Sequence, residues 1–329
     1  MKRLNSPFIH PIWAFFSNKA VLKGLKWLAA LLLVVYVVSK LRSAPDGLSV
    51  VGNLRQTGHL AGFALVLVLA NWGIETTKWW WLVRRLLPDF RWKAALRSVL
   101  IGVSSGMITP NRIGEYAGRV WVLPPGHRVE AAGLLLADRL SQMVATLAGG
   151  FVAIVFYSDA WFPLAPKWQV WLIPVSGVLL GGSLLLFTFI RQLPFLHLAN
   201  KAGLGPAWLS WRRVPASIRW GLIGASSLRF GIFCIQFWLL LGAFGQEVSL
   251  AEGLSYAAMV FWIKSILPSL ALGEVGVRET VALAVAEWLA WNTAACVFAA
   301  FSLFVINLLL PSLLGLIPLL MLRSESDPK

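Results

Sequence analysis

The stretch LAGFALVLVLANWGIETTKWWWLV, residues 60–83, is an apolar segment long enough to cross a lipid bilayer as a single helix. Its three consecutive tryptophans at 79–81 directly precede Arg84 and Arg85, a pattern typical of an anchor at the membrane–water interface. Glu75 and Lys78 stand three residues apart, so we expect them to form an intrahelical ion pair near that interface. This segment decides the fold class, because similar apolar stretches recur along the chain.

The composition of the whole chain requires the bilayer as solvent. Of its 329 residues 58% are hydrophobic and 13% charged, and a soluble domain of this size has no core large enough to bury so much apolar surface. The apolar runs are too long for the alternating strands of a membrane barrel, so helices must satisfy the backbone. We therefore predict an all-α polytopic membrane protein. The sequence predicts six full spans, at about 21–39, 60–83, 131–157, 170–190, 220–243 and 293–322.

Charge distribution excludes several functions. The net charge of +15 comes from Lys and Arg in the loops between apolar runs, which is typical of cytoplasmic loops and anionic lipid rather than of nucleic-acid binding. Cys234 and Cys296 lie within apolar runs and predict no disulfide framework. The four histidines are scattered, and no nucleophile or nucleotide-binding motif is present. We expect no metal, no cofactor and no nucleic-acid partner.

Two segments, 98–124 and 253–290, are apolar but interrupted. The breaks are proline and glycine residues: Pro110 and Gly114 in the first segment, and Pro268, Gly273 and Gly276 in the second. The basic loops at 84–97 and 191–219 all lie in the cytoplasm only if each broken segment enters and leaves the bilayer on one side. The sequence therefore predicts two re-entrant hairpins, the first on the cytoplasmic side and the second facing out, with both termini cytoplasmic.

The two halves of the chain repeat this plan. Residues 1–160 and 161–329 each contain two spans, a hairpin and a third span, in opposite orientations. Both hairpins carry Gly-Glu-x-x-x-Arg, with Glu115 and Arg119 in the first and Glu274 and Arg278 in the second. Glu and Arg four residues apart share one face of a helix and can pair. We expect an inverted repeat, an architecture in which substrates bind on broken helices between the repeats.

Charged residues in and beside the hairpins are the candidate substrate-binding residues, because a charge inside the bilayer faces a cavity or a partner. They are Arg112, Glu115, Arg119, Asp138, Arg139, Lys264, Glu274, Arg278 and Glu279. The arginines of the two motifs are predicted to contact phosphate, and the motif glutamates to orient them or to contact an amine; alternatively, these pairs only hold the hairpins.

Two further charged sites remain open to interpretation. Asp138 and Arg139 are adjacent, so they point to different faces of their helix, and either a contact to the first hairpin or a ligand role is expected. Arg229 and Gln236 lie seven residues apart on one face of their span and are candidates to line the same cavity.

These residues carry a resemblance to a known family. Pro110 to Arg119, the Asp138-Arg139 pair, and Leu267-Pro268 through Gly273-Glu274-Val275-Gly276-Val277-Arg278-Glu279 resemble the lysylphosphatidylglycerol synthase transmembrane-region family of flippase-like proteins. Glu274 departs from the family, which more often has a second glycine there. The resemblance implies a lipid-translocating domain in the bacterial cytoplasmic membrane, like that of the multiple peptide resistance factor or of relatives linked to hopanoid or polyprenol-sugar handling. We expect the family's soluble aminoacyl-transfer domain to be absent, so the sequence gives no reason to expect synthase activity.

Three functions are compatible with the sequence. The first is a transporter of a lipid or lipid-linked head group, coupled to ions or acting as a scramblase, because no nucleotide site is visible. The second is a membrane partner subunit of a separate glycosyltransferase or lipid synthase. The third is an intramembrane lipid transferase, for which Glu279 and Asp138 are the candidate acid–base groups.

Overall fold

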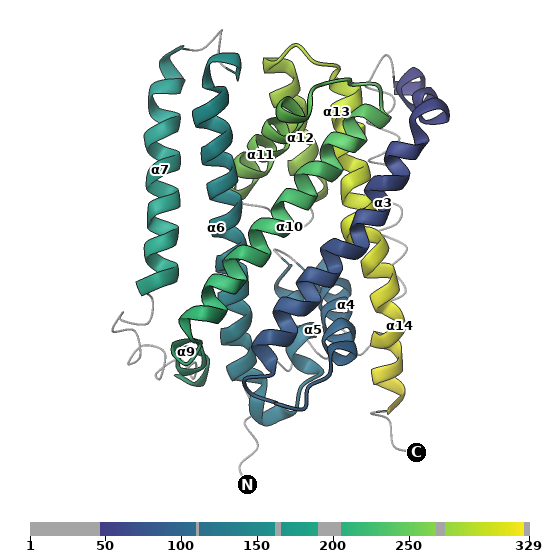
Figure 1. The fold of residues 1–329 in the computed structure, drawn as a ribbon. Coiled ribbons are helices and arrows are strands. Elements are labelled where there is room, and N and C mark those ends of the chain that lie inside the picture. Colours follow the sequence, from purple (N-terminus) through teal and green to yellow (C-terminus); the bar gives the residue numbers. More distant parts are fainter. Residues whose placement is uncertain (1–46, 110–111, 162–165, 190–204, 268–273, 326–329) are drawn as a thin grey trace. The chain divides into compact units, whose positions relative to one another are not determined.

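The computed structural model describes residues 47–109, 112–161, 166–189, 205–267 and 274–325, and these residues form helices with no β-strand among them. Apart from the first residues of the first described helix, they belong to one compact unit that begins at Val50 (Figure 1). The all-helical fold class is confirmed for this part of the chain. Its polar side chains gather inside and large apolar side chains cover the outer faces of the long helices, the arrangement expected of a protein dissolved in lipid.

Long helices form the body of the unit. They are α3 (Gly47–Val83), α6 (Arg128–Trp161), α7 (Pro166–Phe189), α10 (Ala216–Ala243), and α13 (Thr293–Phe304) continuing through the π-helix η4 (Val305–Leu309) into α14 (Leu310–Glu325). Among the described residues, five stretches are long and apolar enough to cross a membrane: 50–83, 125–156, 171–189, 216–243 and 293–320. They correspond to the second to sixth predicted spans. The first predicted span, at 21–39, lies outside the described residues.

Shorter helices occupy the two broken segments. The first contains α4 (Trp92–Ile108) and α5 (Ile113–Trp121), and the second contains α11 (Leu250–Ile266) and α12 (Glu274–Trp288). Figure 1 shows α4 and α5 near one end of the unit and α11 and α12 toward the other. The remaining elements are the 3-10 turn η2 (Pro125–His127) and α9 (Gly205–Arg212).

The predicted breaks are partly corrected. Gly276 lies inside α12 and therefore does not break the segment, since one glycine costs a helix only about 1 kcal/mol. Gly114 is the second residue of α5, so it follows the break rather than forming it. Pro110, Pro268 and Gly273 lie outside the described residues.

Glycines let α4 and α5 pack as an antiparallel pair at very short range. A Cβ atom added to Gly114 would lie 2.3 Å from the carbonyl oxygen of Ser105. One added to Gly118 would lie 2.9 Å from Cα of Gly102. Both distances are too short for a side chain, so glycine is required on this seam. The glycines that interrupt the apolar pattern thus serve close packing, which brings the charged face of α5 toward the body of the unit.

The tryptophans at 79–81 do not form a simple interfacial anchor. Trp79 is fully buried, and its indole N–H donates a hydrogen bond to Ser98 Oγ at 2.9 Å. The indole N–H of Trp80 donates to the carbonyl of Phe90 at 2.9 Å. Among the three, Trp81 alone is exposed. The anchor prediction is therefore wrong for Trp79, and the N–H groups of Trp79 and Trp80 stabilise the corner between α3 and α4.

Candidate functional site

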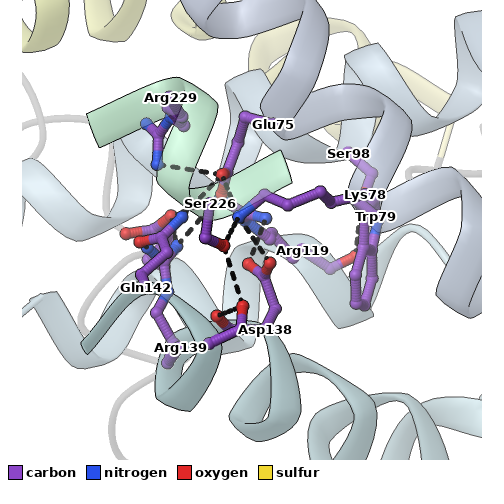
Figure 2. A network of polar contacts seen from close by, with 12 residues as sticks. Glu75, Lys78, Trp79, Ser98, Arg119, Asp138, Arg139, Gln142, Ser226 and Arg229 are labelled. Atoms are coloured by element: carbon purple, nitrogen blue, oxygen red, sulfur yellow. Dashed lines mark hydrogen bonds and ion pairs between the residues drawn. The ribbon is translucent and has the colours of Figure 1, made fainter. Parts of the chain in front are cut away.

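Eight charged side chains from four helices meet inside the unit, and we call them the ion cluster; Figure 2 labels six of them, all except Arg112 and Glu115. Each makes at least one ion pair with another member. They are Glu75 and Lys78 of α3, Arg112, Glu115 and Arg119 at the start of α5 and within it, Asp138 and Arg139 of α6, and Arg229 of α10.

Glu75 is the centre of the ion cluster. Its Oε1 accepts a hydrogen bond from Arg119 Nη2 at 2.5 Å, and its Oε2 lies 2.9 Å from Arg229 Nη1 and 3.2 Å from Lys78 Nζ. Gln142 Nε2 also donates to Oε2, at 2.8 Å. One carboxylate therefore joins α3, α5, α6 and α10. The predicted pair of Glu75 with Lys78 is confirmed, and both side chains are fully buried among protein groups; that the pair lies near the membrane interface stays a prediction.

Glu115 gathers a second set of arginines. Arg119 Nη2 lies 2.6 Å from its Oε1, so the pairing predicted from the four-residue spacing is confirmed. Arg112 Nη2 lies 2.8 Å from Oε2, and Arg139 also donates to Oε1. Arg112 precedes α5 in a left-handed conformation, with φ of 55°, which is uncommon for a residue other than glycine and often marks a functional position. The Glu115–Arg119 pair is therefore not isolated, because both members have partners from other segments.

Asp138 and Arg139 serve different partners, as their adjacency predicts. Asp138 Oδ1 lies 2.7 Å from Lys78 Nζ, whereas Arg139 pairs with Glu115. Lys78 also donates to Ser226 Oγ at 3.2 Å, and Ser226 lies 2.9 Å from Ser141 Oγ. This side of the ion cluster is completely buried, so Lys78 and Asp138 tie α3 to α6 and α10.

Arg119 is buried, and its Nη2 donates hydrogen bonds to the carboxylates of both Glu75 and Glu115. Its guanidinium lies 5.9 Å from the ring centre of Trp79, a cation–π contact, and its backbone carbonyl accepts a hydrogen bond from Ser98 Oγ at 2.8 Å. Its side chain is 1% exposed and is covered by the carboxylates of Glu75 and Glu115. The geometry therefore favours Arg119 as the residue that holds the ion cluster together over the phosphate contact that the sequence predicts for it.

The least buried members of the ion cluster are all arginines. Their side-chain exposures are 27% for Arg112, 21% for Arg139 and 12% for Arg229, whereas the carboxylates of the cluster are exposed by 3% or less. Arg112 and Arg139 share Glu115, and Arg139 and Arg229 share Glu75, so the three arginines are contiguous. We call them the arginine rim.

The ion cluster carries more positive than negative charge. Five cations face three carboxylates, a formal excess of two, and an excess of one remains if Arg112 at the edge is set aside. The neighbouring carboxylates each contact several cations already, so the guanidinium groups are suited to bind a further anion. Their planar donors match the oxygens of phosphate. The arrangement can therefore bind an anionic group within the protein.

The candidate residues of the second broken segment are placed less completely. Glu279 is fully buried on α12, and Lys264 and Arg278 are half-buried on α11 and α12. Glu274 is the first residue of α12, and its side chain lies outside the described part. That these residues share a cavity with the ion cluster stays a prediction.

Sequence reasoning missed two polar members of the site, Gln142 and Ser226. Gln142 bridges Arg139 and Glu75, because Arg139 Nη1 donates to its Oε1 at 3.0 Å. Its position three residues after Arg139 on the same helix is a signal that could have identified it. Ser226 carries no such signal, because only the packing of α10 on α3 brings it to Lys78.

Residues 25–315 match a family model described as the lysylphosphatidylglycerol synthase TM region. The chain belongs to this family. The match includes the ion cluster and both broken segments, and it confirms the resemblance seen in residues 110–119, 138–139 and 267–279. Membership and the apolar helices place the chain among multi-pass membrane proteins connected with lipids. Comparison with curated proteins and with solved structures found no match.

Proposed function

We propose that the chain is a flippase-like transporter that moves a lipid with a phosphate-bearing head group across the cytoplasmic membrane. The observation that carries this proposal is the arginine rim on a buried ion cluster with excess positive charge. A lipid must take its charged head group through an apolar layer while its tails remain in lipid. A cationic site inside a helical membrane body provides what that passage needs.

Charges buried in a membrane protein are energetically costly. A single charged side chain at the centre of a bilayer costs about 2.5–3.5 kcal/mol even on the lenient insertion scale. An unpaired charged head group in hydrocarbon is more costly still, because it loses its hydration with no partner to replace it. Residues that maintain buried charges therefore serve a purpose beyond stability, since apolar substitutes of similar volume are often at least as stable. An anion bound at the rim would neutralise the excess charge and gain charge-assisted hydrogen bonds from guanidinium groups.

The carboxylates favour phosphate over an amine as the group recognised here. Glu75 and Glu115 each contact three or more cations and are almost fully buried. An ammonium group would have to displace one of these arginines. The orienting role that the sequence leaves open for Glu115 is therefore the better supported one, and a lysyl-modified lipid would also be held by its phosphate.

The short helices support the predicted membrane arrangement. Helices α4, α5, α11 and α12 have 17, 9, 17 and 15 residues, fewer than the about 20 that a crossing requires. As two pairs toward different ends of the unit, they fit re-entrant hairpins of opposite orientation in an inverted repeat. In this arrangement α5 delivers Arg112 and Glu115 from the cytoplasmic side.

Lipid movement in proteoliposomes tests the proposal. The purified protein is reconstituted with a trace of phosphatidylglycerol labelled with a dithionite-sensitive fluorophore, and the fraction of label reached by external dithionite is followed with time. We expect wild type to move the label and Arg139→Ala to slow movement about tenfold or more, because charge-assisted contacts contribute about 1.5–3 kcal/mol. Arg139→Lys should recover only part of the rate, since an ammonium cannot match two phosphate oxygens.

A matched control is Arg85→Ala, an exposed arginine outside the ion cluster, which should leave the rate unchanged. If wild type moves no lipid, or if Arg139→Ala equals wild type, the proposal is wrong.

Mass spectrometry of the recovered lipid separates the alternatives, because a covalently changed lipid would indicate a transferase. Movement that requires an added membrane enzyme would indicate a partner subunit.

A further inference from the structure

A second buried polar network starts at the arginine rim and leads away from the ion cluster. Arg229 Nε donates to Asn71 Oδ1 at 2.5 Å, and Asn71 Nδ2 donates to Asn307 Oδ1 at 3.0 Å. Asn307 Nδ2 donates to Gln236 Oε1 at 3.1 Å, and Gln236 Nε2 donates to the carbonyl of Ala64 at 2.8 Å. We call Asn71, Asn307 and Gln236 the amide relay. They come from three spans and all are buried.

The two ends of the amide relay fix the direction of every hydrogen bond in it. The Ala64 carbonyl can only accept, so the amide nitrogen of Gln236 faces it and its oxygen faces Asn307. The same reasoning orients Asn307 and then Asn71, whose oxygen is left to accept from Arg229, a group that can only donate. No amide can flip without losing two buried hydrogen bonds. Because amides do not titrate, the relay cannot carry protons. Its hydrogen bonds can fix the orientation of the side chains that they join, including Arg229.

A local irregularity in the last span places Asn307 in the relay. Asn307 lies in the π-helix η4, in which Leu310 N–H bonds to the carbonyl of Val305. Pro311 follows directly, and a proline lacks the N–H that would bond to residue 307 and crowds that carbonyl, which favours a widened turn before it. Single π-helical turns occur frequently at functional sites. The regular α-helical hydrogen bonding of the span is therefore interrupted at the turn that contributes Asn307 to the relay.

We infer that Asn71, Asn307 and Gln236 are positioning residues that hold Arg229 for the head group and make the last span part of the anion-binding site. This inference rests on the proposed function. Arg229 has two polar partners: its Nε donates to Asn71 Oδ1, and its Nη1 lies 2.9 Å from Glu75 Oε2. Its guanidinium lies 5.2 Å from the ring centre of Phe233 and 5.8 Å from that of Trp72. Losing the relay leaves the charge in place but frees its orientation.

A double-mutant cycle on lipid binding tests this role. Affinity of the purified protein in detergent for phosphatidylglycerol is measured by native mass spectrometry for wild type, Asn307→Leu, Arg229→Met and the double variant. We expect Asn307→Leu to weaken binding about tenfold, within the coupling seen for contacting residues. In the Arg229→Met background the same change should weaken binding by less than about twofold, because the relay acts only through Arg229.

Two further variants keep the test decisive. Gln236→Met removes the far end of the relay without touching Arg229 and should reproduce the effect of Asn307→Leu. Ser104→Ala removes another buried link to the last span, the hydrogen bond from Ser104 Oγ to the Ser312 carbonyl at 2.5 Å, and should leave affinity unchanged. Equal losses in Ser104→Ala and Asn307→Leu would show a structural role only.

The outcomes separate this inference from the proposed function. If wild type binds and moves phosphatidylglycerol while Asn307→Leu and Gln236→Met match it, the positioning role is wrong and the proposed function stands. If the loss caused by Asn307→Leu is the same with and without Arg229, the relay does not act through that arginine. If wild type neither binds nor moves the lipid, both the inference and the proposed function are overturned.

Discussion

The two pairs of short helices carry the same Gly-Glu-x-x-x-Arg pattern and yet are built differently. In α4 and α5 glycines allow backbone contact, and Glu115 and Arg119 enter a cluster fed by three other helices. In α11 and α12 an aromatic residue fills the seam: the Tyr256 hydroxyl donates to the Ala282 carbonyl at 2.6 Å, and its ring stacks on Trp291. The shared motif places a glutamate and an arginine on one helix. The helices that pack against it decide how deeply these side chains are buried.

The largest expected effect comes from the motif arginines themselves. Arg119→Met removes the buried cation that Glu75 and Glu115 share, at 2.5 and 2.6 Å, and removing one partner of a buried ion pair costs about 3–5 kcal/mol. Arg278→Met in the second pair should cost less, because that side chain is only half-buried. The free energy of unfolding in bicelles, measured by steric trapping, compares the two. Equal losses would mean that the two motifs are equivalent after all.

Breaking the glycine seam should have the next largest effect. Gly114→Ala places a methyl group against the Ser105 carbonyl, and overpacking of this kind costs about 1–3 kcal/mol. Gly62→Ala in α3 is the matched control, because nothing lies within 4 Å of its added Cβ and alanine favours a helix. Thermal denaturation in detergent should show a lower midpoint for Gly114→Ala alone. A stable Gly114→Ala variant would rule out close backbone contact between α4 and α5.

A smaller effect is expected where the second pair relies on a side chain. Tyr256→Phe removes the hydroxyl and its buried hydrogen bond to the Ala282 carbonyl, at a cost of about 0.5–1.5 kcal/mol. The ring stays, so the stacking on Trp291 should persist. The same thermal assay measures this change. A loss as large as that of Arg119→Met would show that the aromatic seam depends on this hydrogen bond more than on packing.

The smallest effect concerns the start of α11, where Ser249 and Glu252 form a capping box. Ser249→Ala should cost about 0.5–1 kcal/mol at neutral pH. The pKa of Glu252 is lowered from its usual value because the Ser249 hydroxyl and backbone N–H donate to its carboxylate. A lowered pKa means stabilisation that is full at neutral pH and fades as pH falls below about 4.3, the ordinary value for glutamate.

Wild type and Ser249→Ala should therefore differ less in their denaturation midpoints at pH 4 than at pH 7. A difference that grows on acidification would contradict the capping box as the source of the effect.

The sequence predicts some parts of the site because their geometry is local. The pairing of Glu115 with Arg119 and that of Glu75 with Lys78 follow from helical spacing and are found. The different partners of Asp138 and Arg139 follow from adjacency on a helix. What spacing cannot give is burial: it predicts that Glu75 and Lys78 pair, but not that other helices enclose both side chains completely.

Arg229 and Gln236 show the same limit. Their shared helical face was evident from the seven-residue spacing, but one joins the ion cluster and the other ends the amide relay. Asn307, which connects them through Asn71, stands inside a strongly apolar span and gives no periodic signal. Its role depends on a π-helical turn and on contacts between residues more than 200 positions apart in the chain.

The apolar stretch at 60–83 determined by itself that this chain is a helical membrane protein, because only a helix satisfies its backbone in lipid. The tertiary structure decided what the charges within that stretch do. Helix spacing fixes which side chains share a face, whereas the partners across that face depend on how α3, α5, α6 and α10 pack. That packing turned two residues of one span into the centre of a cationic site edged by arginines.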